Sequence, residues 1–141
     1  MRLDPLTPAQ RSRLMARIRQ KHTAPERIVR SLLHRLGLRF TVNGPHNRTL
    51  PGRPDIVLPR HRTAIFVHGC FWHRHRGCSK SMAPAVRRTF WLEKFRANIK
   101  RDARVQRKLR RAGWRVFVVW ECQTRERQKL ANVLSARFVT S

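Results

Sequence analysis

Residues 68–78 of this sequence combine side chains that bind metals, titrate near neutral pH and stack on flat groups. This segment, HGCFWHRHRGC, holds two of the three cysteines and three of the seven histidines. Cys70, His75 and Cys78 have the spacing of ligands to a structural zinc ion, which is tetrahedral and needs a fourth ligand. Cys122 is the remaining cysteine and follows a predicted strand, so it is the candidate for that fourth position.

Other ligand sets are open from spacing alone. His73 or His61 could replace His75, or the cysteines could be buried free thiols beside surface histidines. Three cysteines do not complete a disulfide framework, and cysteines beside histidines are typical of a reduced, intracellular protein that binds metal. No segment has the pattern of a signal peptide, and the longest apolar run, 116–120, is too short to span a bilayer. We therefore expect structural Zn²⁺ and a cytoplasmic protein without membrane segments.

The seven acidic residues are few enough to consider one by one. Asp55 begins a predicted strand directly after Pro54, where many metal-dependent nucleases place a metal-binding aspartate. Hard cations such as Mg²⁺ prefer carboxylate and carbonyl oxygens. The next predicted strand has Val67 where such enzymes usually have a second acid, so only a backbone carbonyl is available there. Asp55 is a candidate Mg²⁺ ligand, and an ordinary turn residue is the alternative.

The charge of the chain points to a polyanionic partner. There are 33 Lys and Arg residues against seven Asp and Glu, which gives a formal net charge of +26. Such an excess repels itself in the folded state, and nucleic acid is the leading candidate for a partner that relieves the repulsion. A genome rich in arginine codons would also raise the count of cations, but it would not explain the scarcity of carboxylates.

The elements that position these residues follow from hydrophobic periodicity and capping signals. Helices are predicted at 8–20, 24–36, 89–111 and 125–138, with capping boxes at 7–10 and 23–26 and Thr124 as the cap of the last helix. Strands are predicted at 38–42, 55–58, 64–67 and 114–120, the last one central in the sheet. Residues 43–53 and the segment from 68 to about 84 are expected to be loops. This order predicts an α/β fold in three layers, a small mixed sheet flanked by helices. The 141 residues form one expected domain, with 1–6 as a flexible tail.

Several short blocks resemble the very short patch repair (Vsr) DNA mismatch endonucleases. They are LPGRPD at 50–55, IFVHGCFWH at 65–73, FWLEK at 90–94, RD at 101–102, GWRV at 113–116 and VWEC at 119–122. The likeness runs in the same order from about residue 8 to residue 130. It implies a restriction-endonuclease-like fold, a structural zinc and catalytic Mg²⁺. The implied reaction is a nick on the 5′ side of the thymine in a T:G mismatch, which deamination of 5-methylcytosine leaves in duplex DNA.

The resemblance also implies roles for individual residues. Asp55 and the Val67 backbone match the Mg²⁺ site, and His73 matches the general base that acts on the attacking water. The groups that match accessory positions around the metal and the scissile phosphate are Glu26, His68 and Asp102. The residues that match the zinc ligands are Cys70, His75, Cys78 and Cys122. The aromatics that match the wedge beside the mismatch are Phe71, Trp72 and Trp91.

Two departures and two further implications accompany the resemblance. Val67 stands where some members have Thr, and the gap between His75 and Cys78 varies among members. The implied enzyme is a monomer associated with the bacterial nucleoid, and mismatch-repair proteins are candidate partners besides the mismatched duplex. For the three aromatics the alternative is core packing, and it is strongest for Trp91 because that residue lies on a predicted helix.

Two other functions agree with parts of the sequence. A non-enzymatic basic zinc protein that binds nucleic acid would explain the charge and the cysteines. It would not explain an aspartate at a strand start or His73 beside the Phe-Trp pair. A restriction endonuclease that cuts both strands of matched DNA would share the catalytic residues but not the preference for a mismatch.

Replacing both Phe71 and Trp72 by alanine is expected to weaken the preference for a T:G duplex over a T:A duplex. A side chain that enters a base step pays less unstacking energy at a mismatch than at a paired step. Competition binding between the two labelled duplexes measures this preference, with binding to the T:A duplex alone as the control for general DNA affinity. Unchanged discrimination would remove the wedge role.

Overall fold

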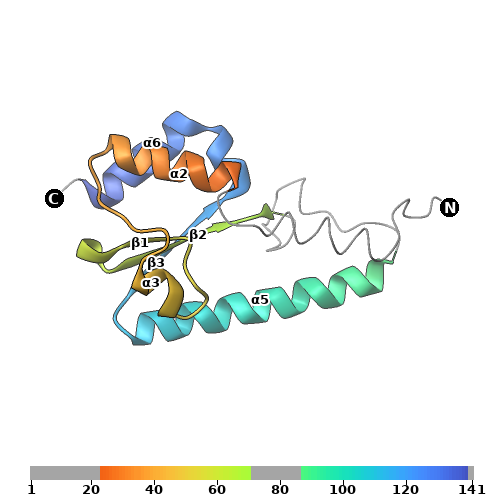
Figure 1. Ribbon diagram of the computed structural model, residues 1–141. Helices are drawn as coiled ribbons and strands as arrows, with labels where there is room; N and C mark the ends of the chain where they lie inside the picture. Colours follow the sequence, from red (N-terminus) through yellow and green to blue (C-terminus); the bar gives the residue numbers. More distant parts are fainter. Residues whose placement is uncertain (1–22, 71–86, 140–141) are drawn as a thin grey trace.

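The computed structural model describes residues 23–70 and 87–139, and a three-stranded sheet lies at its centre (Figure 1). The strands are β1 (Ile56–Leu58), β2 (Thr63–His68) and β3 (Arg115–Trp120). β1 pairs antiparallel with β2, and β2 pairs in parallel with β3. The sheet is mixed, as expected. Its order is β1-β2-β3, so the prediction that residues 114–120 are central was wrong, and β2 holds that place.

Helices cover both faces of the sheet. They are α2 (Ala24–Arg35), α3 (Pro45–Thr49), α5 (Arg88–Arg111) and α6 (Arg127–Phe138), with short 3₁₀ turns η1 (Pro59–His61) and η3 (Glu121–Arg125). Figure 1 shows α2 and α6 on one face and α5 along the opposite face, which makes three layers. No helix in the described part of the chain is long and apolar enough to cross a membrane.

Alternation along the strands produces two cores, one on each face. Successive strand side chains point to opposite faces, so every second residue contributes to the same core. The core under α2 and α6 contains Ile56, Leu58, Ile65 and Val119 from the sheet, with Leu33 and Leu134 from the helices. The core under α5 contains Val57, Ala64 and Phe66, with Leu109 and Trp114. Among the described residues, helices therefore cover both faces of the sheet, and the ends of the sheet are available for a site.

The segment between α2 and β1 differs from its prediction. Residues 38–42 do not form a strand, because a single bridge between Thr41 and Val57 is the whole pairing there. The expected loop at 43–53 contains α3, which begins at Pro45 after Gly44. Proline suits the first turn of a helix, where its missing N–H is not needed.

Two helix starts also differ from their predictions. Thr23 is the N-cap of α2, but its side chain makes no capping hydrogen bond. α6 begins at Arg127 after Glu126, and the Thr124 hydroxyl instead donates to the Glu121 carbonyl within η3. The helix expected at 8–20 and the loop from 71 to 84 lie outside the described residues.

The packing of α6 generates a stability prediction. Leu134 is fully buried, whereas its neighbour Val133 is 47% exposed. Leu134→Ala is expected to lower the free energy of unfolding by about 2–5 kcal/mol, because it removes buried methyl groups and leaves a cavity. Val133→Ala is expected to change it by less than about 0.5 kcal/mol, as surface substitutions do. Urea denaturation of the two variants measures the difference, and equal effects would contradict this core.

Candidate active site

One end of the sheet collects most of the described residues that sequence analysis singled out. β1 begins at this end, and β2 and β3 both finish there, because Ile56 pairs with Ile65 and His68 pairs with Trp120. Asp55 precedes β1, so it lies beside the last residues of β2. Antiparallel pairing of β1 with β2 and parallel pairing of β2 with β3 thus bring three separate parts of the chain together.

Asp55 is anchored directly to β2. Its Oδ2 accepts a hydrogen bond of 2.8 Å from the Val67 backbone N–H. Val57 exchanges both of its backbone hydrogen bonds with Thr41, on the side away from β2. Since backbone groups alternate in direction along a strand, Ile65 and Val67 then turn both N–H and C=O toward the β1 side. The Asp55 carboxylate and the Val67 carbonyl therefore lie on the same side of β2, beyond the start of β1.

A buried asparagine holds the backbone that leads to Asp55. Asn47, which is 1% exposed, donates through Nδ2 to the carbonyls of Thr41 and Pro54 at 3.0 and 3.1 Å. Its Oδ1 accepts from the Thr41 hydroxyl at 2.6 Å and from the Gly44 N–H at 3.2 Å. Asn47 is not among the predicted site residues, because residues 43–53 were expected to be a loop. Asn three residues after Gly44 was the available signal, since Asn near a turn often bonds to nearby backbone.

The other side of this loop rests on α5. Gly52 has a φ of +75°, a conformation that side chains rarely adopt. A Cβ at this position would overlap the side chain of Val105 on α5 and lie 3.3 Å from the Phe66 ring. The glycine therefore allows the loop before Asp55 to approach α5 closely.

His68 and Asp102 belong to the α5 side of the site. His68 is 7% exposed, and its ring lies 5.3 Å from the Trp120 ring, edge to face, and 5.9 Å from the Phe66 ring. Asp102 is half-buried on the side of α5 that also carries the buried Asn98, one helical turn earlier. Both residues are thus directed to the same layer of the molecule.

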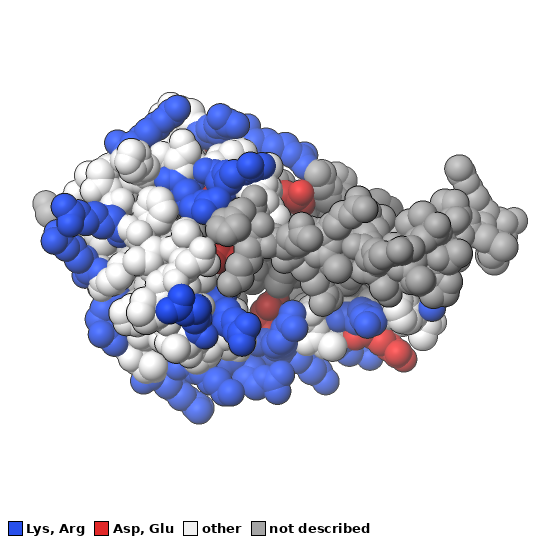
Figure 2. Space-filling view, viewed as in Figure 1, with Lys and Arg blue, Asp and Glu red and all other residues white. Residues whose placement is uncertain are grey.

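Glu26 comes from the opposite layer. It lies in the first turn of α2, is half-buried, and belongs to a helix that packs against η3. Figure 1 shows the start of α2 beside this end of the sheet. Glu121, the first residue of η3, adds a further half-buried carboxylate there. Figure 2 shows most of the visible carboxylates toward the middle of this view, with Lys and Arg mainly around the periphery.

The candidate zinc ligands are described only in part. Cys70 is buried and Cys122 is half-buried, neither in a disulfide, and they lie just beyond the ends of β2 and β3 respectively. His61 lies in η1 at the opposite end of the sheet, where its ring contacts Phe138, so it is too far away to replace His75. Within residues 23–70 and 87–139, no three His, Cys, Asp or Glu side chains form a cluster that could hold a metal.

Five other predicted site residues lie outside the described residues: Phe71, Trp72, His73, His75 and Cys78. Trp91 is described, and it is 6% exposed, with its ring stacked on Phe95 at 6.1 Å. In this structure Trp91 therefore packs within the protein, beside the exposed ring of Phe90.

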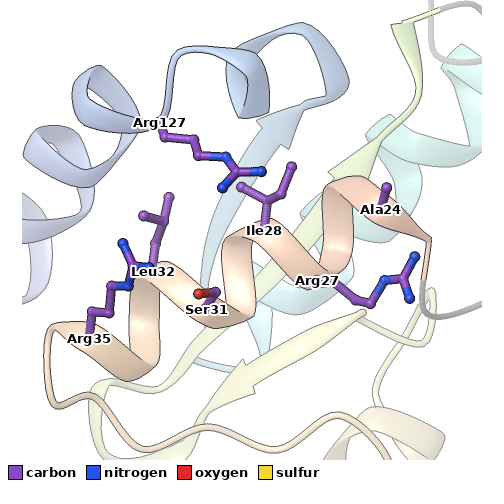
Figure 3. A pocket seen from close by; sticks show the side chains of 7 residues that line it. All are labelled: Ala24, Arg27, Ile28, Ser31, Leu32, Arg35 and Arg127. Carbon is purple, nitrogen blue, oxygen red and sulfur yellow. The ribbon is translucent and has the colours of Figure 1, made fainter.

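A groove elsewhere on the surface contains none of the predicted site residues. It is a cavity of about 330 Å³ between α2 and the start of α6, with Ile28 and Leu32 among its lining residues. Figure 3 shows Arg127 reaching over it from α6, with Arg27 and Arg35 on α2. Its described lining residues include no carboxylate, so it does not compete with the end of the sheet as a catalytic centre.

The sequence of the chain matches a known protein family. The sequence model for "DNA mismatch endonuclease Vsr" matches residues 3–80, which is more than half of the chain. The chain belongs to the Vsr family. A Vsr relative from Xanthomonas oryzae pv. oryzae, the type II nicking enzyme V.XorIIP, is 46% identical over 135 residues, which cover 93% of this chain and 96% of that one.

Two further Vsr relatives cover most of the chain. The DNA mismatch endonuclease Vsr of Escherichia coli is 47% identical over 124 residues, 88% of this chain and 77% of its own. The type II nicking enzyme V.NmeAIP of Neisseria meningitidis is 40% identical over 124 residues, 88% of this chain and 86% of its own. The resemblance that the short blocks indicated is confirmed.

Asn47→Ala is expected to lower the free energy of unfolding by about 1–3 kcal/mol, because it leaves buried backbone groups around Pro54 without a partner. Thr49→Ala on the same short helix is the control. The Thr49 hydroxyl is exposed and bonds only to the Pro45 carbonyl, so its loss should change stability by less than about 0.5 kcal/mol. Urea denaturation compares the two, and an Asn47 variant as stable as the control would contradict the anchoring role.

Proposed function

We propose that this protein is a Mg²⁺-dependent DNA endonuclease that nicks one strand of duplex DNA on the 5′ side of the thymine in a T:G mismatch. The observation that carries the proposal is the Asp55 carboxylate bonded at 2.8 Å to β2, in a chain of the Vsr family. Family membership supports DNA endonuclease activity. The Escherichia coli relative is named a DNA mismatch endonuclease, which supports specificity for a mismatched base pair.

The oxygen atoms at Asp55 fit a hard divalent cation. The carboxylate is fixed by the Val67 N–H, and strand alternation turns the Val67 carbonyl to the same side. Carboxylate and carbonyl oxygens are the ligands that Mg²⁺ takes in proteins. Mg²⁺ held by these two groups would supply stabilisation of the negative charge that develops on the scissile phosphate.

The proton chemistry is proposed for histidine. His73 takes the proton of the attacking water, a task suited to a side chain whose ordinary pKa is about 6.5. His68, Asp102 and Glu26 orient the water and the phosphate around the Asp55 site. Support for this grouping comes from the elements that carry the three residues. His68 ends β2, α5 contacts the loop before Asp55 through Val105, and α2 contacts η3, which follows β3.

A structural zinc is proposed beside the catalytic centre, with Cys70, His75, Cys78 and Cys122 as ligands. The two described cysteines are not in disulfides and follow neighbouring strands, which fits a site that joins the segment after β2 to the segment after β3. A bound zinc would supply cross-linking without redox chemistry. The ion would hold His73 and the proposed wedge of Phe71 and Trp72 in a fixed relation to Asp55.

The relatives that are named type II nicking enzymes support cleavage of a single strand. The rival functions are separated by one assay with a labelled T:G duplex and a T:A control in Mg²⁺ or EDTA. Nicking of the thymine strand only, only at T:G and only with Mg²⁺, is the expected result. Cleavage of both strands in T:A would indicate a restriction endonuclease, and binding without cleavage a non-enzymatic protein.

Asp55→Ala is expected to abolish nicking in Mg²⁺ while the variant still binds the mismatched duplex, because the carboxylate serves the cation rather than DNA affinity. Nicking is measured on denaturing gels, and binding is measured in EDTA by mobility shift. Glu126→Ala is the matched control, since Glu126 is exposed and its ion pair with Lys129 is a surface pair at 3.6 Å. Full nicking by the Asp55 variant would overturn the proposed mechanism.

A further inference from the structure

The outward face of α5 carries cations that the proposed chemistry does not use. Exposed basic residues follow one another along it at steps of three or four: Arg96, Lys100, Arg104, Arg107 and Arg111. At about 3.6 residues per turn, these five positions lie within an arc of roughly 80° around the helix axis. They lie opposite the face that buries Trp91, Phe95 and Leu109. We refer to these five residues as the α5 stripe. Figure 2 shows Lys and Arg gathered along the lower edge of the molecule, where Figure 1 places α5.

The α5 stripe is not neutralised by other described residues. None of its five side chains makes a hydrogen bond or an ion pair within residues 23–70 and 87–139. Other cations on α5 do have partners, since Arg101 donates to Asn98 and Arg110 donates to Gln106. Glu93 lies on the same side as the stripe, one turn before it, and forms no ion pair with any of its five described cations.

The spacing of the α5 stripe works against the helix itself. Residues three or four apart on a helix have Cβ atoms about 5–6 Å apart, and like charges at this spacing are destabilising. Every consecutive pair in the stripe has this spacing. A row of repelling cations without a partner among the described residues is relieved when a polyanion lies along it.

We propose that the α5 stripe is a second DNA-binding surface, which holds the phosphate backbone of duplex DNA outside the cleavage site. The stripe is about 22 Å long at 1.5 Å per residue, and one DNA strand has a phosphate about every 3.4 Å along the axis. A single strand thus presents roughly six phosphates over its length. Lys and Arg side chains that bind phosphates read no sequence information, so binding is independent of sequence.

The duplex segment on the α5 stripe is distinct from the segment that is cut. The stripe faces away from the sheet, whereas Asp55 and His68 lie at the end of the sheet. DNA as the partner rests on the proposed function. The surface therefore increases the time that the protein stays on matched DNA, and it adds affinity at a mismatch only where flanking DNA is long enough to reach α5.

The test compares the wild-type chain with a variant in which all five stripe residues are replaced by glutamine, which keeps helix propensity. Fluorescence anisotropy measures binding to a matched duplex of about 40 base pairs as salt is raised. The plot of log affinity against log salt has a negative slope. The magnitude of this slope is expected to decrease by about 0.9 for each phosphate that the variant no longer neutralises, and so by up to about 4.5. Because this duplex has no mismatch and is only bound, the result does not depend on T:G nicking.

A control of equal charge replaces Arg35, Arg39, Arg60, Arg115 and Arg125 by glutamine; these residues are exposed and lie outside α5. Far-UV circular dichroism checks that both variants keep α5. A control that changes the slope as much as the stripe variant would overturn the proposal, because total charge alone would then explain binding. Single-stranded RNA of equal length is measured in parallel, and a loss confined to RNA would also overturn it.

Discussion

The hydrogen bond from the Val67 amide to the Asp55 carboxylate depends on unequal strand lengths. β1 has three residues and β2 has six, so β2 continues past the point where its antiparallel partner begins. A backbone amide without a partner is unfavourable inside a protein, and here a side chain takes the place of the missing strand. The same geometry turns the Val67 carbonyl to the side of β2 on which the carboxylate lies. In the candidate active site, the Asp55 side chain therefore continues the hydrogen bonding of the sheet beyond β1. The other candidate residues are arranged around Asp55 and Val67.

The loop that carries Asp55 is held from two directions. Asn47 bonds to the Pro54 carbonyl on the α3 side, and Gly52 lies against Val105 on the α5 side. α5 also carries the half-buried Asp102. A movement of α5 relative to the sheet would thus displace two of the proposed site residues together. Because the loop before Asp55 and the residue Asp102 are both held by α5, their positions relative to each other stay the same.

The strands β1 and β2 and the long helix α5 lie within one residue of their predicted bounds, because hydrophobic periodicity is a local property. Strand order is not local. The apolar run in β3 indicates cover on both faces, which an edge strand between two helical layers also has. Asn47 could not be found from its residue type, because its partners include backbone carbonyls, which have no sequence signature. The position of Asp55 beside Val67 was predictable, because the short turn between β1 and β2 fixes which of their residues face each other. The roles of His73 and the wedge aromatics still rest on the family motif.

The parallel pairing of β2 with β3 has a consequence for how the molecule reaches its final state. The paired residues are about 50 positions apart in the chain, whereas those of β1 and β2 are separated by a turn of a few residues. Closing a long loop requires a larger loss of chain entropy, so the hairpin can form early while β3 joins late. Asp55 and Val67 then meet before Glu121 and Cys122 arrive. During synthesis, the chain would accordingly bring the oxygens of Asp55 and Val67 together before the rest of the candidate active site, and nuclease activity would be absent until folding is complete.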